Sequence, residues 1–137
     1  MSRLSNIAVG DTIETRSFQP GNVSLFMYNA AIWNPHRIHY DEIYTTQVEK
    51  HPGVVIDGPL QGDWLSQVVT EWAGDDGRLV SFEYSNRRAT YLGETLYSGG
   101  TVAAIDHDAK TVTLDLQIKN ESGDVTSPGR AVVRFAG

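Results

Sequence analysis

Apolar and polar residues alternate most clearly between residues 111 and 119. The apolar positions in this stretch are Val112, Leu114, Leu116 and Ile118. A period of two residues is typical of a strand with one buried face. Residues 80–84 and 125–135 alternate in the same way, and polar turn segments at 106–110 and 120–124 separate the later strands. The pattern therefore predicts antiparallel strands joined by short turns.

The longest predicted helix begins at Asp57-Gly58-Pro59. Glycine at the helix cap and proline at the first helical position are favoured start signals, and Gly74 is a typical residue to end the helix. Large apolar residues follow the start at four-residue spacing, so we expect the helix to be buried along most of its length. These residues are Leu60, Trp64, Val68 and Trp72.

Two shorter helices are predicted on either side of a polar bend. Asn22 can cap the first helix, Pro35 cannot continue it, and Asp41 can cap the second. The apolar residues at helical spacing are Val23, Phe26, Met27 and Ala30 in the first helix, and Ile43, Tyr44 and Val48 in the second. The bend at residues 33–41 therefore lies between two helices.

These elements predict one domain that spans residues 1–137. Two further strands are expected at residues 10–18 and 94–105. Strands that mostly follow one long apolar helix favour an α+β fold, in which a curved antiparallel β-sheet wraps around a central α-helix.

Composition excludes several classes of function. The formal net charge of −6 argues against nucleic acid as a partner. The chain has no cysteine, which excludes disulfides and thiol nucleophiles. Because it also lacks a signal-peptide pattern and any apolar run of about 18 residues, we expect a cytoplasmic protein with no membrane partner.

The polar bend concentrates the side chains that could carry chemistry. Its sequence is Trp33-Asn34-Pro35-His36-Arg37-Ile38-His39-Tyr40-Asp41. Together with Gly58-Pro59-Leu60, this string resembles the MaoC-like (R)-specific enoyl-CoA hydratases and 3-hydroxyacyl-thioester dehydratases, which have the hotdog fold. The resemblance implies a lyase that reversibly adds water to a trans-2-enoyl-CoA or a related acyl thioester. Coenzyme A then belongs to the substrate, and no cofactor is expected.

The resemblance also implies roles for individual residues. His39 takes the position of the family's catalytic histidine, whereas the family's catalytic aspartate falls on Asn34, which can orient water but cannot act as a base. His36 is a candidate second proton carrier. Gly58 would donate its N–H to the thioester oxygen, and Asp57 should point away from that oxygen or be paired. The substitution Asn34→Asp is expected to leave an active enzyme.

Further residues are candidates for binding the substrate. Arg87, Arg88 and Arg37 suit phosphate groups, because guanidinium is a planar cation with several donors, although a solvated edge is an equal alternative. Trp33 and Tyr40 could form the walls of an acyl tunnel, although buried aromatic residues more often belong to the core.

Three alternatives remain open from the sequence. The spacing of His36, His39 and Asp41 permits a metal site, but we expect none, since no third strong ligand is evident elsewhere. Thioester hydrolysis would need a carboxylate near the start of the long helix, such as Asp57 or Asp63. A non-catalytic subunit of a hetero-oligomeric hydratase is the third possibility. Because exposed strand edges are normally covered, we also predict a homodimer or higher oligomer.

Overall fold

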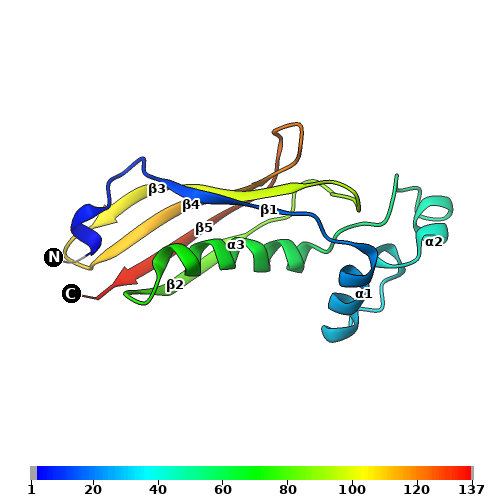
Figure 1. Ribbon diagram of the computed structural model, residues 1–137, viewed down its shortest axis with the longest axis horizontal. Helices are drawn as coiled ribbons and strands as arrows, with labels where there is room; N and C mark the ends of the chain where they lie inside the picture. The colour runs from blue at the N-terminus through cyan, green and yellow to red at the C-terminus, as the bar shows by residue number, and fades with distance from the viewer. Residues whose placement is uncertain (1–2, 137) are drawn as a thin grey trace.

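A computed structural model describes residues 3–136 of the protein. Five antiparallel strands form one sheet in the order β1-β3-β4-β5-β2, and α3 lies along one face of this sheet (Figure 1). The strands are β1 Thr12–Phe18, β2 Gly77–Tyr84, β3 Leu96–Asp106, β4 Thr111–Lys119 and β5 Val125–Phe135. The helices are α1 Asn22–Ala31, α2 Glu42–Gln47 and α3 Gly58–Ala73, with 3-10 turns η1 Arg3–Asn6 and η2 Arg37–His39.

The core forms between α3 and the inner face of the sheet. The alternating apolar residues of β4 and β5 are buried on this face, as their spacing predicts. They pack with the buried side of α3, which includes Trp64, Leu65, Val68 and Val69. The predicted α+β arrangement of an antiparallel sheet around a long helix is confirmed.

Helix α3 begins and ends close to its predicted limits. Asp57 is the N-cap residue, Pro59 lies one position later than expected, and Gly74 ends the helix with φ of 64°. A Cβ atom at Gly62 would lie 2.2 Å from the Tyr84 ring, so glycine is needed where β2 approaches the helix. This close approach anchors the first two turns of α3 against the sheet.

The two short helices form as predicted, but their apolar faces point away from the core. In α1, Val23 and Met27 are 72% and 64% exposed, and the buried residues are Leu25 and Asn29. Gly21, not Asn22, is the N-cap residue of α1. Helical spacing shows that one face is apolar, yet it does not say what covers that face.

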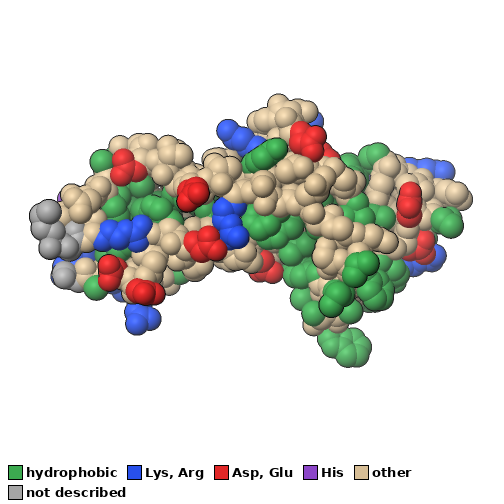
Figure 2. Space-filling view, viewed as in Figure 1, with side chains coloured by type: hydrophobic (Ala, Val, Ile, Leu, Met, Phe, Trp, Pro, Cys, Tyr) green, Lys and Arg blue, Asp and Glu red, His purple; other side chains and the backbone are tan. Residues whose placement is uncertain are grey.

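Helix α2 shows the same reversal. Ile43 and Val48 are exposed, and Thr45 is the buried residue of this helix. Asp41 caps α2 through the backbone N–H of Tyr44, as predicted. Helices α1 and α2 lie together at one end of the sheet, and hydrophobic side chains gather on the surface at this end (Figures 1 and 2).

The bend and the segment that leads into α3 meet at this same end of the molecule. Val55 pairs with Tyr91 in an isolated bridge, and its N–H donates to the carbonyl of Ile38. The hydrogen bond to Ile38 thereby holds the segment that leads into α3 beside η2. Within residues 3–136, none of the helices combines the length and apolar character that crossing a membrane requires.

Candidate active site

The 3-10 turn η2 positions both histidines of the bend. His36 caps this turn, and its Nδ1 accepts a hydrogen bond from the N–H of Ile38 at 3.3 Å. The N–H of His36 donates to Asn34 Oδ1 at 3.1 Å. His39 ends the turn, with its ring centroid 5.9 Å from that of His36. His36 is exposed and His39 is buried, so the two imidazoles lie in different environments.

A backbone carbonyl fixes the ring of His39. Its Nδ1 lies 2.7 Å from the carbonyl oxygen of Val55. A carbonyl oxygen can only accept a hydrogen bond, so Nδ1 carries the proton in the neutral ring. Nε2 then has the free lone pair and can act as a base. The local backbone therefore sets both the tautomer and the orientation of His39.

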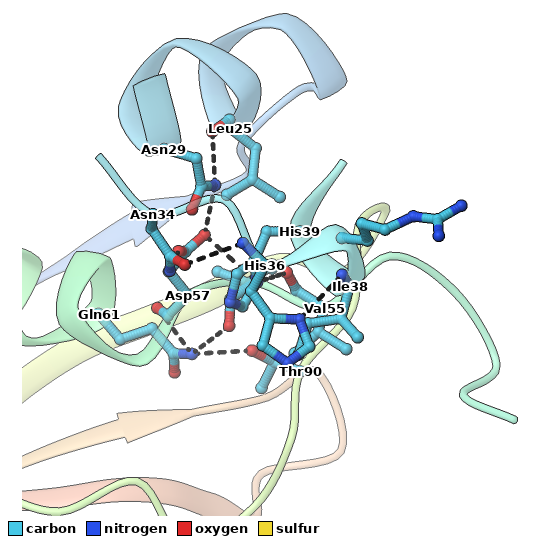
Figure 3. Close-up of polar contacts among 12 residues, drawn as sticks. Leu25, Asn29, Asn34, His36, Ile38, His39, Val55, Asp57, Gln61 and Thr90 are labelled. Atoms are coloured by element: carbon cyan, nitrogen blue, oxygen red, sulfur yellow. Dashed lines mark hydrogen bonds and ion pairs between the residues drawn. The ribbon is translucent and has the colours of Figure 1, made fainter. Parts of the chain in front are cut away.

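Asp57 lies beside this histidine and has no exposed surface. Its Oδ1 is 3.5 Å from His39 Nδ1 and accepts a hydrogen bond from Asn29 Nδ2 at 2.9 Å. Its Oδ2 accepts from Asn34 Nδ2 at 3.3 Å (Figure 3). The prediction that this carboxylate is paired is confirmed. The sequence did not indicate its partners, because α1, the bend and the start of α3 meet only in the fold.

A buried amide, Gln61, fixes the first turn of α3. Its Nε2 donates to Thr90 Oγ1 at 3.1 Å and to the carbonyl of Ile56 at 3.4 Å (Figure 3). Its Oε1 accepts from Ser127 Oγ at 3.3 Å. Sequence reasoning missed Gln61 and Asn29 as residues near the site. For Gln61, the sequence did contain a signal: an amide side chain lies between apolar residues of a helix that was expected to be buried.

A cavity of about 290 Å³ opens beside His39 and the start of α3. Gly58, Arg87 and Arg88 also line it. Both arginines are exposed, and Arg88 forms an ion pair with Asp124 at 3.0 Å. The fold thus brings together the predicted base, the predicted oxyanion donor and two predicted phosphate-binding residues.

Gly58 is the first residue of α3, where backbone N–H groups have no partner inside the helix. Among residues 3–136, no group accepts a hydrogen bond from its N–H. A Cβ atom at Gly58 would lie 2.2 Å from Asn86 Nδ2, so a larger residue would displace Asn86. The helix start therefore presents a donor to the cavity that His39 lines.

A second cavity, of about 380 Å³, has mostly apolar walls. Phe26, Trp33, Pro35 and Tyr40 line it, and Asn34 belongs to the same wall. Trp33 has φ of 56° and is 91% exposed, so it is a surface residue of this chain and not a core residue. Trp33 and Tyr40 line the same cavity.

Arg37 and Asp41 lie apart from both cavities. Arg37 Nη2 pairs with Asp41 Oδ2 at 2.8 Å, and its guanidinium stacks over Tyr44. The N–H of Tyr44 and the Arg37 guanidinium hold the pKa of Asp41 below its usual value. In the described part of the chain, no three His, Asp or Glu side chains are placed to hold a metal. Through the ion pair with Arg37 and the hydrogen bond from Tyr44, Asp41 stabilises the bend.

Tyr28 of α1 adds a polar group near the carboxylates. Its hydroxyl lies 3.4 Å from Asp63 Oδ2. Burial raises the pKa of Tyr28 to about 12, and the negative charges of Asp63 and Asp57 act in the same direction. Tyr28 is therefore neutral over the whole physiological pH range.

Comparison with solved structures identifies the class of fold. The (R)-hydratase from A. caviae involved in PHA biosynthesis has a TM-score of 0.86 at 18% identity, covering 95% of this chain and 98% of that chain. The ChsH1-ChsH2 complex from Mycobacterium tuberculosis has a TM-score of 0.82 at 15% identity, covering 94% and 98%. Identities this low establish the fold alone, and the predicted hotdog fold is confirmed.

The chain belongs to the type 2 hydroxyacyl-thioester dehydratases. The model of that family, "Hydroxyacyl-thioester dehydratase type 2", matches residues 4–92, which include the whole bend and the start of α3. The mesaconyl-C(4)-CoA hydratase of Chloroflexus aurantiacus is 46% identical over 46 residues, which are 34% of this chain and 16% of that protein. The chain spans 20% or less of the length of the two curated relatives it matches.

Proposed function

We propose that the protein catalyses the reversible addition of water to a trans-2-enoyl-CoA, or a related acyl thioester, to give a 3-hydroxyacyl thioester. The observation that carries the proposal is the state of His39, whose Nδ1–H is held by Val55 and whose ring lines the same cavity as Gly58. Membership in a family of hydroxyacyl-thioester dehydratases supports the same reaction class.

In this mechanism, His39 Nε2 removes a proton from a bound water as the water oxygen bonds to the β-carbon. Negative charge moves onto the thioester oxygen, where the N–H of Gly58 and the positive end of α3 stabilise it. The imidazolium then returns its proton to the α-carbon. Water is thereby added across the double bond, and the enzyme regains its neutral imidazole.

Asn34 and His36 have secondary roles in this proposal. Asn34 borders the apolar cavity and contacts Asp57, so it can orient water or hold the site in shape. His36 is exposed beside His39 and could exchange protons with solvent. The proposal makes His39 the base, since Asn34 is not a base and His36 Nδ1 accepts a hydrogen bond in capping η2.

The substrate would use both cavities. Arg87 and Arg88 carry positive charge at the cavity beside Gly58 and suit the phosphates of coenzyme A or of an acyl-carrier arm. Trp33 and Tyr40 line the apolar cavity, which suits the acyl chain. Coenzyme A enters as part of the substrate, and the proposed chemistry needs no further cofactor.

Hydrolysis of the thioester is less well supported. It would need a carboxylate that can reach the thioester carbon, and Asp57 is fully buried behind His39. Asp63 is exposed but contacts Tyr28, and it is not among the residues that line the cavity beside Gly58. Hydration therefore agrees better with the positions of both carboxylates.

The test is an assay of the purified chain with enoyl thioesters of several lengths. Loss of the conjugated enoyl absorbance reports hydration, and a thiol reagent reports hydrolysis. We expect His39→Ala to lower kcat by about 1000-fold with the fold intact, since a positioned acid–base group contributes about 10²- to 10⁴-fold. His107→Ala, in the turn between β3 and β4, is the matched control and should be neutral. A folded His39→Ala variant with near wild-type hydration would contradict the mechanism.

We also propose that the protein assembles as a dimer through the β2 edge of the sheet. Leu79 and Val80 are 39% and 46% exposed on this edge strand, and edges of this kind are usually covered. Leu79→Lys/Val80→Lys should give a monomer in light scattering after gel filtration. Val125→Lys, at a similarly exposed position on β5, should remain a dimer. A fully active monomeric wild-type protein would disprove this assembly.

A hetero-oligomer, in which this chain completes the site of another subunit, is the alternative to a homodimer. The apolar residues that α1 exposes would suit either partner. A wild-type chain that is inactive alone toward every enoyl thioester would favour the hetero-oligomer. The lack of cysteine agrees with a cytoplasmic location, which we retain as a proposal.

A further inference from the structure

We infer that Asp57 supplies the carboxylate partner of His39, from the start of α3 and not from the bend. The inference rests on the proposed function, in which His39 becomes positively charged during the reaction. Asp57 acts through the imidazole and does not need to touch the substrate, so it is a positioning residue.

The burial of Asp57 is the first observation. Its side chain has no exposed surface, and a buried carboxylate is costly unless it is paired and hydrogen-bonded. Both oxygens have amide donors, from Asn29 at 2.9 Å and from Asn34 at 3.3 Å. The two amides hold the carboxylate in one orientation, with Oδ1 3.5 Å from His39 Nδ1. A separation of 3.5 Å permits an ion pair once the ring is protonated.

The position of Asp57 in the chain is the second observation. Asp57 is the N-cap residue of α3, and an aspartate at this position commonly accepts a hydrogen bond from the first turn of its own helix. Here the side chain makes no capping hydrogen bond. It is directed instead to the amides and to the histidine (Figure 3). Helix capping therefore does not account for the carboxylate.

The charges around His39 indicate what the carboxylate does. Arg87 and Arg88 line the same cavity as the ring, so their guanidinium groups oppose a further positive charge there. Tyr28 is neutral. Asp57 is the only ion-pair partner of His39 in the described part of the chain. It therefore favours the imidazolium that forms when water loses its proton.

Asn34 then has a definite role. It occupies the position of the family's acid, but here it donates a hydrogen bond to the carboxylate at position 57. The residue types at positions 34 and 57 can therefore be swapped, and one carboxylate and one amide would still be in contact. This exchange defines a charge-conserving test of the inference.

The test compares Asp57→Asn with the exchange variant Asn34→Asp/Asp57→Asn. Asp57→Asn should lower kcat about 100-fold with little change in KM, and its loss of rate in acid should move to lower pH. The exchange variant should have a kcat at least about tenfold higher than that of Asp57→Asn, because a carboxylate again lies beside the site. Asp63→Asn removes an exposed carboxylate six residues further along the chain, in α3; it is the matched control and should be neutral.

A second measurement does not depend on turnover. Side-chain NMR follows the pH at which the His39 ring takes up its proton, and Asp57→Asn should lower that pH, because a negative charge beside the ring is removed. An unchanged midpoint, or kcat within threefold of wild type while His39→Ala is inactive, would overturn the inference and leave the proposed function intact. A wild-type protein without hydratase activity would overturn the proposed function, and the NMR titration would still decide the pairing.

Discussion

The substitution Asn34→Asp tests the geometry of the site through stability. From the sequence alone, this change restores the acid of the family and is expected to leave the enzyme active. The structure adds that the side chain of Asn34 lies 3.3 Å from Asp57 Oδ2 and donates a hydrogen bond to it. A carboxylate at position 34 would face a second carboxylate at this distance and would lose that hydrogen bond. We therefore expect Asn34→Asp to destabilise the folded protein near neutral pH.

The size of the effect follows from two limits. Two negative charges 3.3 Å apart repel by about 5 kcal/mol at an effective dielectric constant of 20. Keeping one acid protonated at pH 7 instead costs about 4 kcal/mol, since an unperturbed aspartate titrates near 3.9. The side chain at position 34 is only partly buried and can turn toward water, so we expect a loss of about 1–3 kcal/mol.

The sign of the pH dependence is fixed by the same reasoning. In the folded variant, the carboxyl groups at positions 34 and 57 hold a shared proton more tightly than they do in the unfolded chain. The loss in free energy of unfolding is therefore absent near pH 4 and grows as the pH rises. Urea unfolding at pH 5 and pH 8 measures this difference. Asn120→Asp, in the turn between β4 and β5, adds the same charge and is the matched control. The exchange variant Asn34→Asp/Asp57→Asn should regain most of the lost stability.

A clear result would refute this reasoning. If Asn34→Asp is as stable as Asn120→Asp at pH 8 and shows the same pH dependence, the two side chains at positions 34 and 57 are not in contact. The assignment of Asp57 to His39 would then lose one of the two amide donors on which its orientation depends.

Two further predictions concern binding and alkaline pH. Arg87→Ala/Arg88→Ala should raise KM for a CoA thioester about tenfold or more with kcat nearly unchanged, because phosphate binding is common to the ground and transition states. Arg16→Ala/Arg134→Ala is the matched control, and an unchanged KM would make the first pair ordinary surface charge. The stability that Tyr28 contributes should be present below about pH 10 and be lost as the pH rises toward about 12, its folded pKa. Urea unfolding of Tyr28→Phe should therefore show a flatter alkaline decline than wild type, and equal declines would contradict the raised pKa.

The sequence predicted the sheet and the long helix well, because both depend on local periodicity. The alternation in β4 selects the buried face within the strand itself, and Val112 and Leu114 are fully buried. Gly58-Pro59 and Gly74 mark the limits of α3 through backbone preferences that act over a few residues. These signals need no knowledge of distant contacts.

The faces of α1 and α2 could not be predicted in the same way. Their apolar spacing is correct for helices, but Met27 and Ile43 point to solvent, and the sheet covers neither helix. Whether an apolar face is buried depends on which element, or which other chain, lies against it. Periodicity within one segment contains no information about that neighbour.

The candidate site was predicted in part. The resemblance indicated His39 and Gly58, and the fold places both on one cavity. The contact between His39 and Asp57 joins residues far apart in the chain, and it depends on the hydrogen bond from the Val55 N–H to Ile38, which holds Val55 beside η2. A carboxylate before a helix start looks like an ordinary cap in the sequence. Only the three-dimensional arrangement shows that it is directed elsewhere.

The absence of a side-chain cap on α3 has a consequence for anion binding. A carboxylate that accepted a hydrogen bond from the first turn would cancel part of the positive potential at that end of the helix. Because the Asp57 side chain is directed away, the positive potential at the helix end is available to a bound anion. Pro59 has no N–H, so it does not compete for that anion. Asp57 would thus stabilise the imidazolium by lying beside it, and it would leave the N–H groups at the helix end free to bind the oxyanion.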